Sequence, residues 1–101
     1  MAYNDVPWAM ENPFPGKLFN SHDASKDWYE GCKMDYTGID VNIYNFMAIL
    51  KGDESSLNLT DSSNTTKRVL GSNERSKVFV SFFDHGAPGM LMFPDTYLYA
   101  D

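Results

Sequence analysis

Six consecutive residues, VFVSFF at 78–83, constrain the fold of this chain more than any other stretch. A strand with one face in solvent alternates apolar and polar residues, whereas a continuous apolar run is typical of a strand covered on both faces. Such strands lie in mostly parallel sheets that are flanked by helices. The sequence therefore predicts an α/β fold in which residues 78–83 form a buried strand.

The segment 41–52, VNIYNFMAILKG, predicts the clearest helix. Asn42 can cap it, because an Asn side chain accepts a hydrogen bond from the free backbone N–H groups of the first turn. Val41 and Phe46 have the spacing of a hydrophobic staple, and Gly52 is a normal helix stop. One face is expected to be apolar and to pack in the core, and it carries Ile43, Phe46, Met47 and Leu50.

Shorter elements are predicted on either side of this helix. Residues 11–20, ENPFPGKLFN, are rich in Pro and Gly and predict an ordered loop. Residues 53–66 are rich in Ser, Thr, Asn and Asp and predict an exposed loop. After a turn at 87–89, MLMF at 90–93 predicts a short strand, and YLYAD at 97–101 begins a further element.

Charge and composition exclude several classes of function. With 101 residues, the chain forms one small domain or part of a larger one. Its net charge is −6 and its eight Lys and Arg residues are scattered, so we expect no nucleic-acid partner. The single cysteine, Cys32, excludes an internal disulfide and a multi-cysteine zinc site.

Targeting signals are sparse. No apolar run is long enough for a transmembrane helix, so we expect no membrane segment in this chain. The first ten residues, MAYNDVPWAM, lack the basic start and the apolar centre of a signal peptide. The protein is therefore expected either to be cytosolic or to carry a targeting segment upstream of residue 1. Two sequons, at Asn58 and Asn64, are candidate glycosylation sites and favour a secretory route.

Asp84, His85 and Gly86 follow the predicted strand and are the candidate catalytic residues. Sites in open α/β sheets lie beyond the carboxyl ends of the strands. An imidazole can take up and return a proton near neutral pH, and the N–H of a glycine can approach a substrate oxyanion closely. Side chains alternate along a strand, so Asp84 is expected to point away from His85 and to be at most a supporting residue. A lone histidine at a strand end is also often a plain polar cap.

A polar stretch after residue 20 contains residue types that bind metals, but their spacing fits no metal site that we know. These residues are His22, Asp23, Asp27, Glu30 and Cys32. We therefore expect neither a metal nor a cofactor.

The chain resembles the legumain (asparaginyl endopeptidase) family of cysteine proteases in four stretches, which occur in the family's order and at about its spacing. They are ENPFPGKLFN at 11–20, YEGCKMDYTGIDV at 29–41, NFMAILKG at 45–52 and VFVSFFDHGAPGMLMFPD at 78–95. The resemblance implies a caspase-like fold, a mostly parallel sheet flanked by helices that is present only in part. It also implies a His/Cys dyad that cleaves peptide bonds after Asn.

The same resemblance implies roles for individual residues. His85 would be the general base of the dyad, and the backbone N–H of Gly86 would lie in the oxyanion hole. Asp84 matches the acid that precedes the histidine in the family and has no assigned role. The substrate would be a peptide or protein with Asn before the scissile bond. The compartment would be the lysosome, the vacuole or the extracellular space.

Two parts of the family's domain are not found within residues 1–101. The family's nucleophile is a cysteine a few dozen residues after the histidine, and the family's first strand is missing as well. We therefore expect a partial peptidase domain that needs flanking segments of the same polypeptide. The chain alone is expected to be inactive, because a base without a nucleophile cannot form an acyl-enzyme. Cys32 matches a non-catalytic family position, which disfavours a Cys32–His85 dyad.

Two alternatives stay open at this point. One is a truncated pseudo-peptidase without activity that acts as a binding protein. The other is a fragment of the catalytic subunit of the GPI-anchor transamidase, which shares the His-Gly element at 85–86. The transamidase would differ in substrate and in carrying a membrane segment near its C-terminus, and the peptidase would differ from the pseudo-peptidase in possessing the downstream cysteine.

Overall fold

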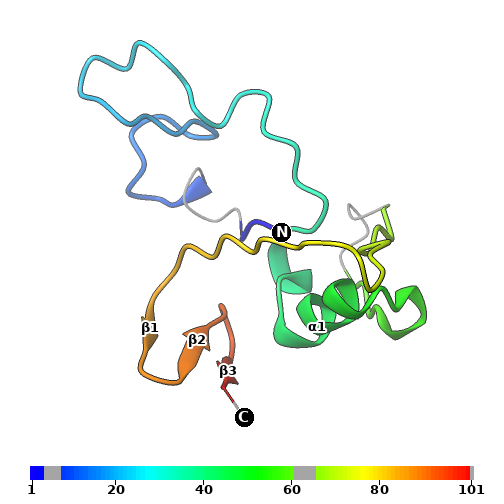
Figure 1. Cartoon of the computed structure of the whole chain (residues 1–101). Coiled ribbons are helices and arrows are strands. Elements are labelled where there is room, and N and C mark those ends of the chain that lie inside the picture. Colours follow the sequence, from blue (N-terminus) through cyan, green and yellow to red (C-terminus); the bar gives the residue numbers. More distant parts are fainter. Residues whose placement is uncertain (4–7, 61–65, 101) are drawn as a thin grey trace.

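The computed structural model describes residues 1–3, 8–60 and 66–100 and is shown in Figure 1. Within these ranges it contains an α-helix, two short 3-10 helices and a small sheet, joined by long irregular segments. In chain order the elements are η2 (Gly38–Asp40), α1 (Ile43–Lys51), η3 (Glu54–Ser56), β1 (Gly86–Ala87), β2 (Met90–Met92) and β3 (Tyr97–Tyr99). None of the helices in these ranges is long and apolar enough to cross a membrane.

The predicted helix is confirmed, together with both of its end signals. The side chain of Asn42 accepts a hydrogen bond from the backbone N–H of Asn45, over 2.9 Å. Gly52 ends the helix in the left-handed region at φ 70°, which is the C-terminal geometry that glycine favours. The apolar face is only half-buried, and the helical residues that are fully enclosed are Asn45 and Ala48.

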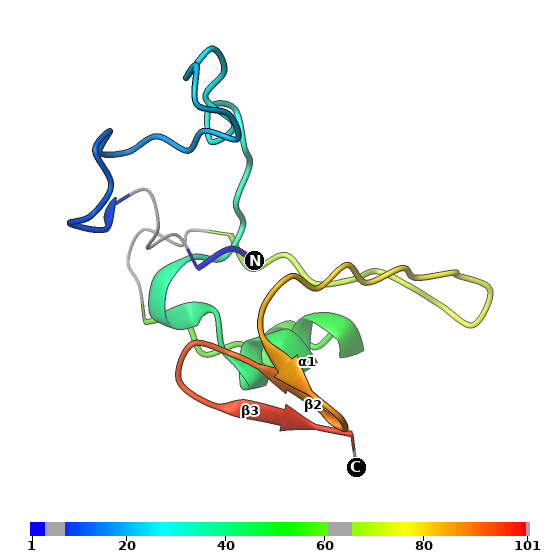
Figure 2. The same cartoon turned by 90° about the vertical axis from the view of Figure 1, so that its left-hand side faces the viewer.

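The sheet is a three-stranded antiparallel meander in the order β1-β2-β3. A turn at Pro88-Gly89 joins β1 to β2, and Gly89 has φ 78°, the positive angle that the third position of a type II turn requires. The short strand predicted at 90–93 is thus confirmed as β2, and the further element expected from residue 97 is the strand β3. Figure 2 shows this sheet close to α1.

Phe93 joins the sheet to the helix. It follows β2 directly, is 6% exposed, and its ring lies 5.4 Å from that of Phe46 on α1. The ring of Phe82 also lies 5.4 Å from the ring of Phe93. This aromatic cluster, with the buried Tyr36, Val41 and Ala48, is the core of the described part of the chain.

The prediction of a buried strand at 78–83 is wrong for this structure, and a parallel sheet is not observed among the described residues. The segment has no strand assignment, and Figure 1 shows it as a long trace leading to β1 without a neighbouring strand. Phe79 and Phe83 are more than 90% exposed. The physical reason is that a strand exists only through pairing with a neighbour, and no described segment pairs with this one.

The loop at 11–20 is ordered by local contacts, as predicted. The rings of Phe14 and Phe19 meet edge to face at 5.2 Å. Asp27 accepts hydrogen bonds from the backbone N–H groups of Leu18 and Tyr29, which ties this loop to the polar stretch that follows. In Figure 1 both segments form an extended lobe, coloured blue to cyan.

Candidate active site

Asp84, His85 and Gly86 lie at the point where the extended segment turns into β1, and all three are exposed. A carboxylate oxygen of Asp84 accepts a hydrogen bond from the backbone N–H of His85 over 2.6 Å. This hydrogen bond is to the backbone of His85 and not to its imidazole, so it fixes the local direction of the chain. The carbonyl oxygen of His85 in turn accepts from the N–H of Met92, over 3.2 Å.

The register of the sheet directs the N–H of Gly86 away from β2. His85 and Met92 are hydrogen-bonded opposite each other, and such pairs alternate with pairs that exchange no hydrogen bond. Gly86 opposite Leu91 is therefore a pair of the second type. The hydrogen bonds between β2 and β3 support this assignment. Phe93 donates to Thr96 and Ala100 donates to Gly89, so the backbone groups of Leu91 face β3 and not β1. The Gly86 N–H thus faces the open edge of β1.

A cavity of about 500 Å³ adjoins the candidate catalytic residues. Asp84 is one of its lining residues, and Phe46, Phe82 and Phe93 are among the others. The cavity is open on one side and lies between α1, the end of the extended segment and the chain start. His85 is not among the lining residues, so the imidazole stands outside this space.

Cys32 is not brought to His85. The thiol donates a hydrogen bond to the backbone carbonyl of Trp28 over 3.1 Å, and the residue is exposed. Figures 1 and 2 show the cyan loop that carries it on the opposite side of the molecule from β1. The two residue types needed for a dyad are therefore present, but they do not meet.

The carboxylates of the polar stretch serve as acceptors for turns. Asp23 accepts from the hydroxyl of Ser21 and from the N–H of Ser25, and these bonds lower its pKa. The pKa of Asp27 is lowered chiefly by the N–H of Leu18. Among the described residues, no group of three or more His, Cys, Asp and Glu side chains is arranged to hold a metal ion.

Two buried polar residues were missed by the sequence analysis. Asp40 ends η2 and Asn45 lies on α1, and both have no exposed surface. The carboxamide of Asn45 bonds to both backbone groups of Asn58, and a carboxylate oxygen of Asp40 accepts from the N–H and the hydroxyl of Thr60. The only sequence signal was polar residues placed among apolar ones, which does not name their partners.

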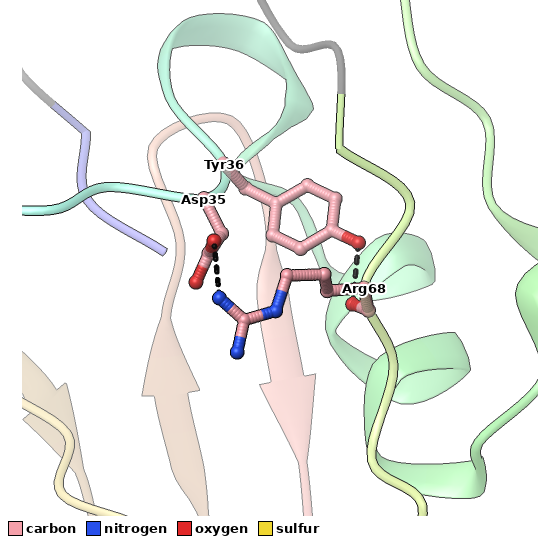
Figure 3. A network of polar contacts seen from close by, with 3 residues as sticks. All are labelled: Asp35, Tyr36 and Arg68. Carbon is pink, nitrogen blue, oxygen red and sulfur yellow. Dashed lines mark hydrogen bonds and ion pairs between the residues drawn. The ribbon is translucent and has the colours of Figure 1, made fainter.

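A second polar network fixes the chain beyond residue 66, as Figure 3 shows. The hydroxyl of Tyr36 donates to the backbone carbonyl of Arg68 over 2.6 Å, and the Arg68 guanidinium lies 3.2 Å from the Asp35 carboxylate. Tyr36 is buried, and that burial raises the pKa of its phenol. The Arg68 side chain of the ion pair is 63% exposed, so the tyrosine is the stronger link.

Comparison with known proteins gives a consistent match along the whole chain. The family model described as Peptidase C13 family matches residues 1–101. The chain is 47% identical over 100 residues to a hemoglobinase of Schistosoma mansoni, and 44% identical over 95 residues to a legumain of Rattus norvegicus. It is 36% identical over 100 residues to a vacuolar-processing enzyme of Citrus sinensis.

These matches cover nearly all of this chain but only a small part of each relative. They span 99%, 94% and 98% of the chain, against 21%, 21% and 19% of the three relatives. The chain therefore corresponds to about a fifth of the length of the curated relatives that it matches.

Proposed function

Because this chain belongs to the peptidase C13 family, we propose that the protein in full is a cysteine endopeptidase that hydrolyses peptide bonds after Asn. The resemblance to the legumain family is confirmed by the relatives named legumain and hemoglobinase. These names favour a peptidase over a transamidase subunit or a non-catalytic binding protein. The substrates are peptides or proteins, with Asn before the scissile bond.

Residues 1–101 are part of the catalytic domain in this proposal. The domain has a caspase-like fold with a mostly parallel sheet that is flanked by helices. Flanking segments of the same polypeptide supply the first strand and the catalytic cysteine. The exposure of Phe79 and Phe83 supports this, because large apolar side chains in a globular domain are normally covered. The match to a fifth of each relative also supports it.

The exposed imidazole of His85, followed by an N–H that faces the open edge of β1, is the observation that carries the mechanism. His85 takes the proton of the cysteine thiol, and the thiolate attacks the Asn carbonyl carbon. The N–H of Gly86 donates to the oxygen that becomes negative. His85 then gives the proton to the leaving amine, and water hydrolyses the thioester by the same path.

The compartment is proposed to be the lysosome, the vacuole or the extracellular space. The name of the Citrus relative, a vacuolar-processing enzyme, and the sequon at Asn58 support this. The second sequon, at Asn64, lies outside the described residues.

His85→Ala in the full-length protein tests the mechanism, with His22→Ala as the matched control. The chain has two histidines, and His22 belongs to the lobe of residues 11–30, which Figure 1 shows away from β1. Removal of a general base lowers kcat/KM by roughly 10²–10⁴-fold, so we expect that loss for His85→Ala on an Asn-containing peptide and none for His22→Ala. Full activity of His85→Ala would refute the assignment.

Residues 1–101 alone should have no activity on the same peptide. Their only cysteine, Cys32, belongs to the loop that Figures 1 and 2 show on the opposite side of the molecule from β1. Turnover by the purified chain that Cys32→Ser abolishes would show instead that Cys32 and His85 act together.

A further inference from the structure

The Asn58-Leu59-Thr60 sequon is held on α1 by the side chain of Asn45. This side chain bonds both backbone groups of Asn58, as a neighbouring strand would. The carboxamide oxygen of Asn45 accepts from the backbone N–H of Asn58 over 2.8 Å, and its nitrogen donates to the Asn58 carbonyl over 3.0 Å. The same nitrogen donates to the carbonyl of Asp40, also over 3.0 Å. Asn45 has no exposed surface, so these bonds are shielded from water.

Thr60, the hydroxyl residue of the sequon, is held as firmly. One carboxylate oxygen of Asp40 accepts from the backbone N–H of Thr60 over 2.8 Å and from its hydroxyl over 2.9 Å. Asp40 has no exposed surface either. Charge-assisted bonds of this kind are stronger than bonds between neutral groups.

Asn58 itself is exposed, and all of its hydrogen bonds to Asn45 are made by its backbone. Its side chain can therefore project from the surface while Thr60 stays docked. A sugar attached to the Asn58 nitrogen would leave every one of these backbone contacts in place. The folded chain is thus compatible with a glycan at this position.

We propose that Asn58 is an N-glycosylation site that is modified only before residues 58–60 dock onto α1. In this reaction the Asn58 side-chain nitrogen forms a bond to the anomeric carbon of a lipid-diphosphate-linked oligosaccharide. The bond from that carbon to the diphosphate breaks, the lipid diphosphate leaves, and the nitrogen loses one proton. The inference rests on the secretory location proposed above, but not on peptidase activity.

The order follows from what the acceptor must offer. A sequon requires a hydroxyl two residues after Asn, so the transferring enzyme has to reach that hydroxyl and the intervening backbone. In the docked segment the Thr60 hydroxyl is bonded to Asp40, and the Asn58 backbone is bonded to Asn45. Transfer to the folded chain therefore requires local opening of the segment.

The first test is peptide mapping by mass spectrometry of the full-length protein from a secreting eukaryotic cell. We expect a glycan at Asn58 that disappears in Asn58→Gln, while Asn64→Gln leaves it in place. A protein that is secreted with Asn58 unmodified would overturn the inference. A protein that does not enter the secretory route would overturn both this inference and the proposed location, and would leave the His85 test unaffected.

The second test addresses the order, with purified oligosaccharyltransferase and lipid-linked oligosaccharide acting on unglycosylated full-length protein. We expect transfer to Asn58 to be roughly tenfold or more slower for native than for unfolded protein, because the docked segment must first open. Asp40→Ala should speed transfer to the native protein. Asp53→Ala is the control, because its carboxylate binds Ser55 and Ser56 and not the sequon. Equal rates for native and unfolded protein would overturn the proposed order.

Discussion

Tyr36 joins two stretches of chain that lie 32 residues apart, through one phenol hydroxyl that donates to the Arg68 carbonyl. Desolvation raises the pKa of this phenol, and the nearby Asp35 carboxylate raises it further. The folded chain therefore holds the phenol proton more strongly than the unfolded chain does. The resulting stability is fully present below the unfolded pKa of about 10 and is lost as the pH rises above it.

Replacement of Tyr36 by Phe should have two effects on the full-length protein. The free energy of unfolding at pH 8 should fall by about 1 kcal/mol, because the hydrogen bond to Arg68 is lost. The further loss of stability above about pH 10 should be smaller than in the original protein, because no buried phenol has to ionise. Urea unfolding at pH 8 and at a pH above 10 measures both changes in the free energy of unfolding. Tyr44→Phe, at an exposed position, is the control, and equal alkaline losses in both variants would contradict the explanation.

At the scale of elements, the end of α1 meets the segment at 68–70. The N–H of Leu70 donates to the carbonyl of Ile49 over 3.1 Å. Gly52 has a positive φ, and a Cβ placed on it would lie 2.6 Å from the backbone oxygen of Leu70. Gly31 has a similar angle, φ 78°, but no atom within 4 Å of such a Cβ. The two glycines therefore separate backbone strain from crowding.

Gly52→Ala and Gly31→Ala should differ in the full-length protein. We expect Gly31→Ala to lower the free energy of unfolding by about 1–2 kcal/mol, through the strained backbone angle alone. Gly52→Ala should lower it by about 2–4 kcal/mol, because the Leu70 backbone must also move. Amide exchange at Leu70 should become faster only in Gly52→Ala. The same exchange rate in both variants would show that crowding is unimportant.

Local signals explain which elements could be predicted from the sequence. The cap at Asn42, the stop at Gly52 and the turn at Pro88-Gly89 all act within a few residues, and α1 and the strand that follows this turn, β2, form as those residues indicate. The Asp84-His85-Gly86 motif was also visible, and its position at the start of β1 follows from the same turn. The outward N–H of Gly86 could not be predicted, because it depends on the register of three strands.

Contacts between distant segments explain what the sequence did not indicate. Asn45 meets Asn58 thirteen residues away, and Asp40 meets Thr60 twenty residues away. A pattern of polar and apolar residues cannot identify such partners. The strand prediction at 78–83 was wrong for a related reason. The composition of these residues is typical of a strand, but it does not show whether a partner strand is present.

At the scale of the whole molecule, residues 78–83 leave large apolar side chains in solvent. Phe79 and Phe83 are 91% and 93% exposed, and about half of Val78 and Val80 is exposed. The segment is paired with no other part of the chain that the structure describes, so its backbone groups are also open to another chain. Residues 1–101 by themselves should therefore self-associate.

Light scattering during gel filtration of residues 1–101 checks this expectation. Association should be evident at micromolar concentrations and should decrease in the double variant Phe79→Ser, Phe83→Ser, because both side chains contribute apolar surface to the contact. Tyr44→Ser removes another largely exposed ring, on α1, and should change nothing. A monomer at all concentrations would refute the role of this segment.

The two polar networks also determine where the chain can change in length. Thr60 is hydrogen-bonded to Asp40, and the backbone carbonyl of Arg68 is hydrogen-bonded to Tyr36. Tyr36 and Asp40 are close in the sequence, at η2 (Gly38–Asp40) and just before it, so this short segment sets how far apart the two attachment points lie. Doubling the length of such a connection adds only about 0.6 kcal/mol of closure entropy. An insertion between Thr60 and Arg68, such as an epitope tag, should therefore leave both attachments, to Asp40 and to Tyr36, in place.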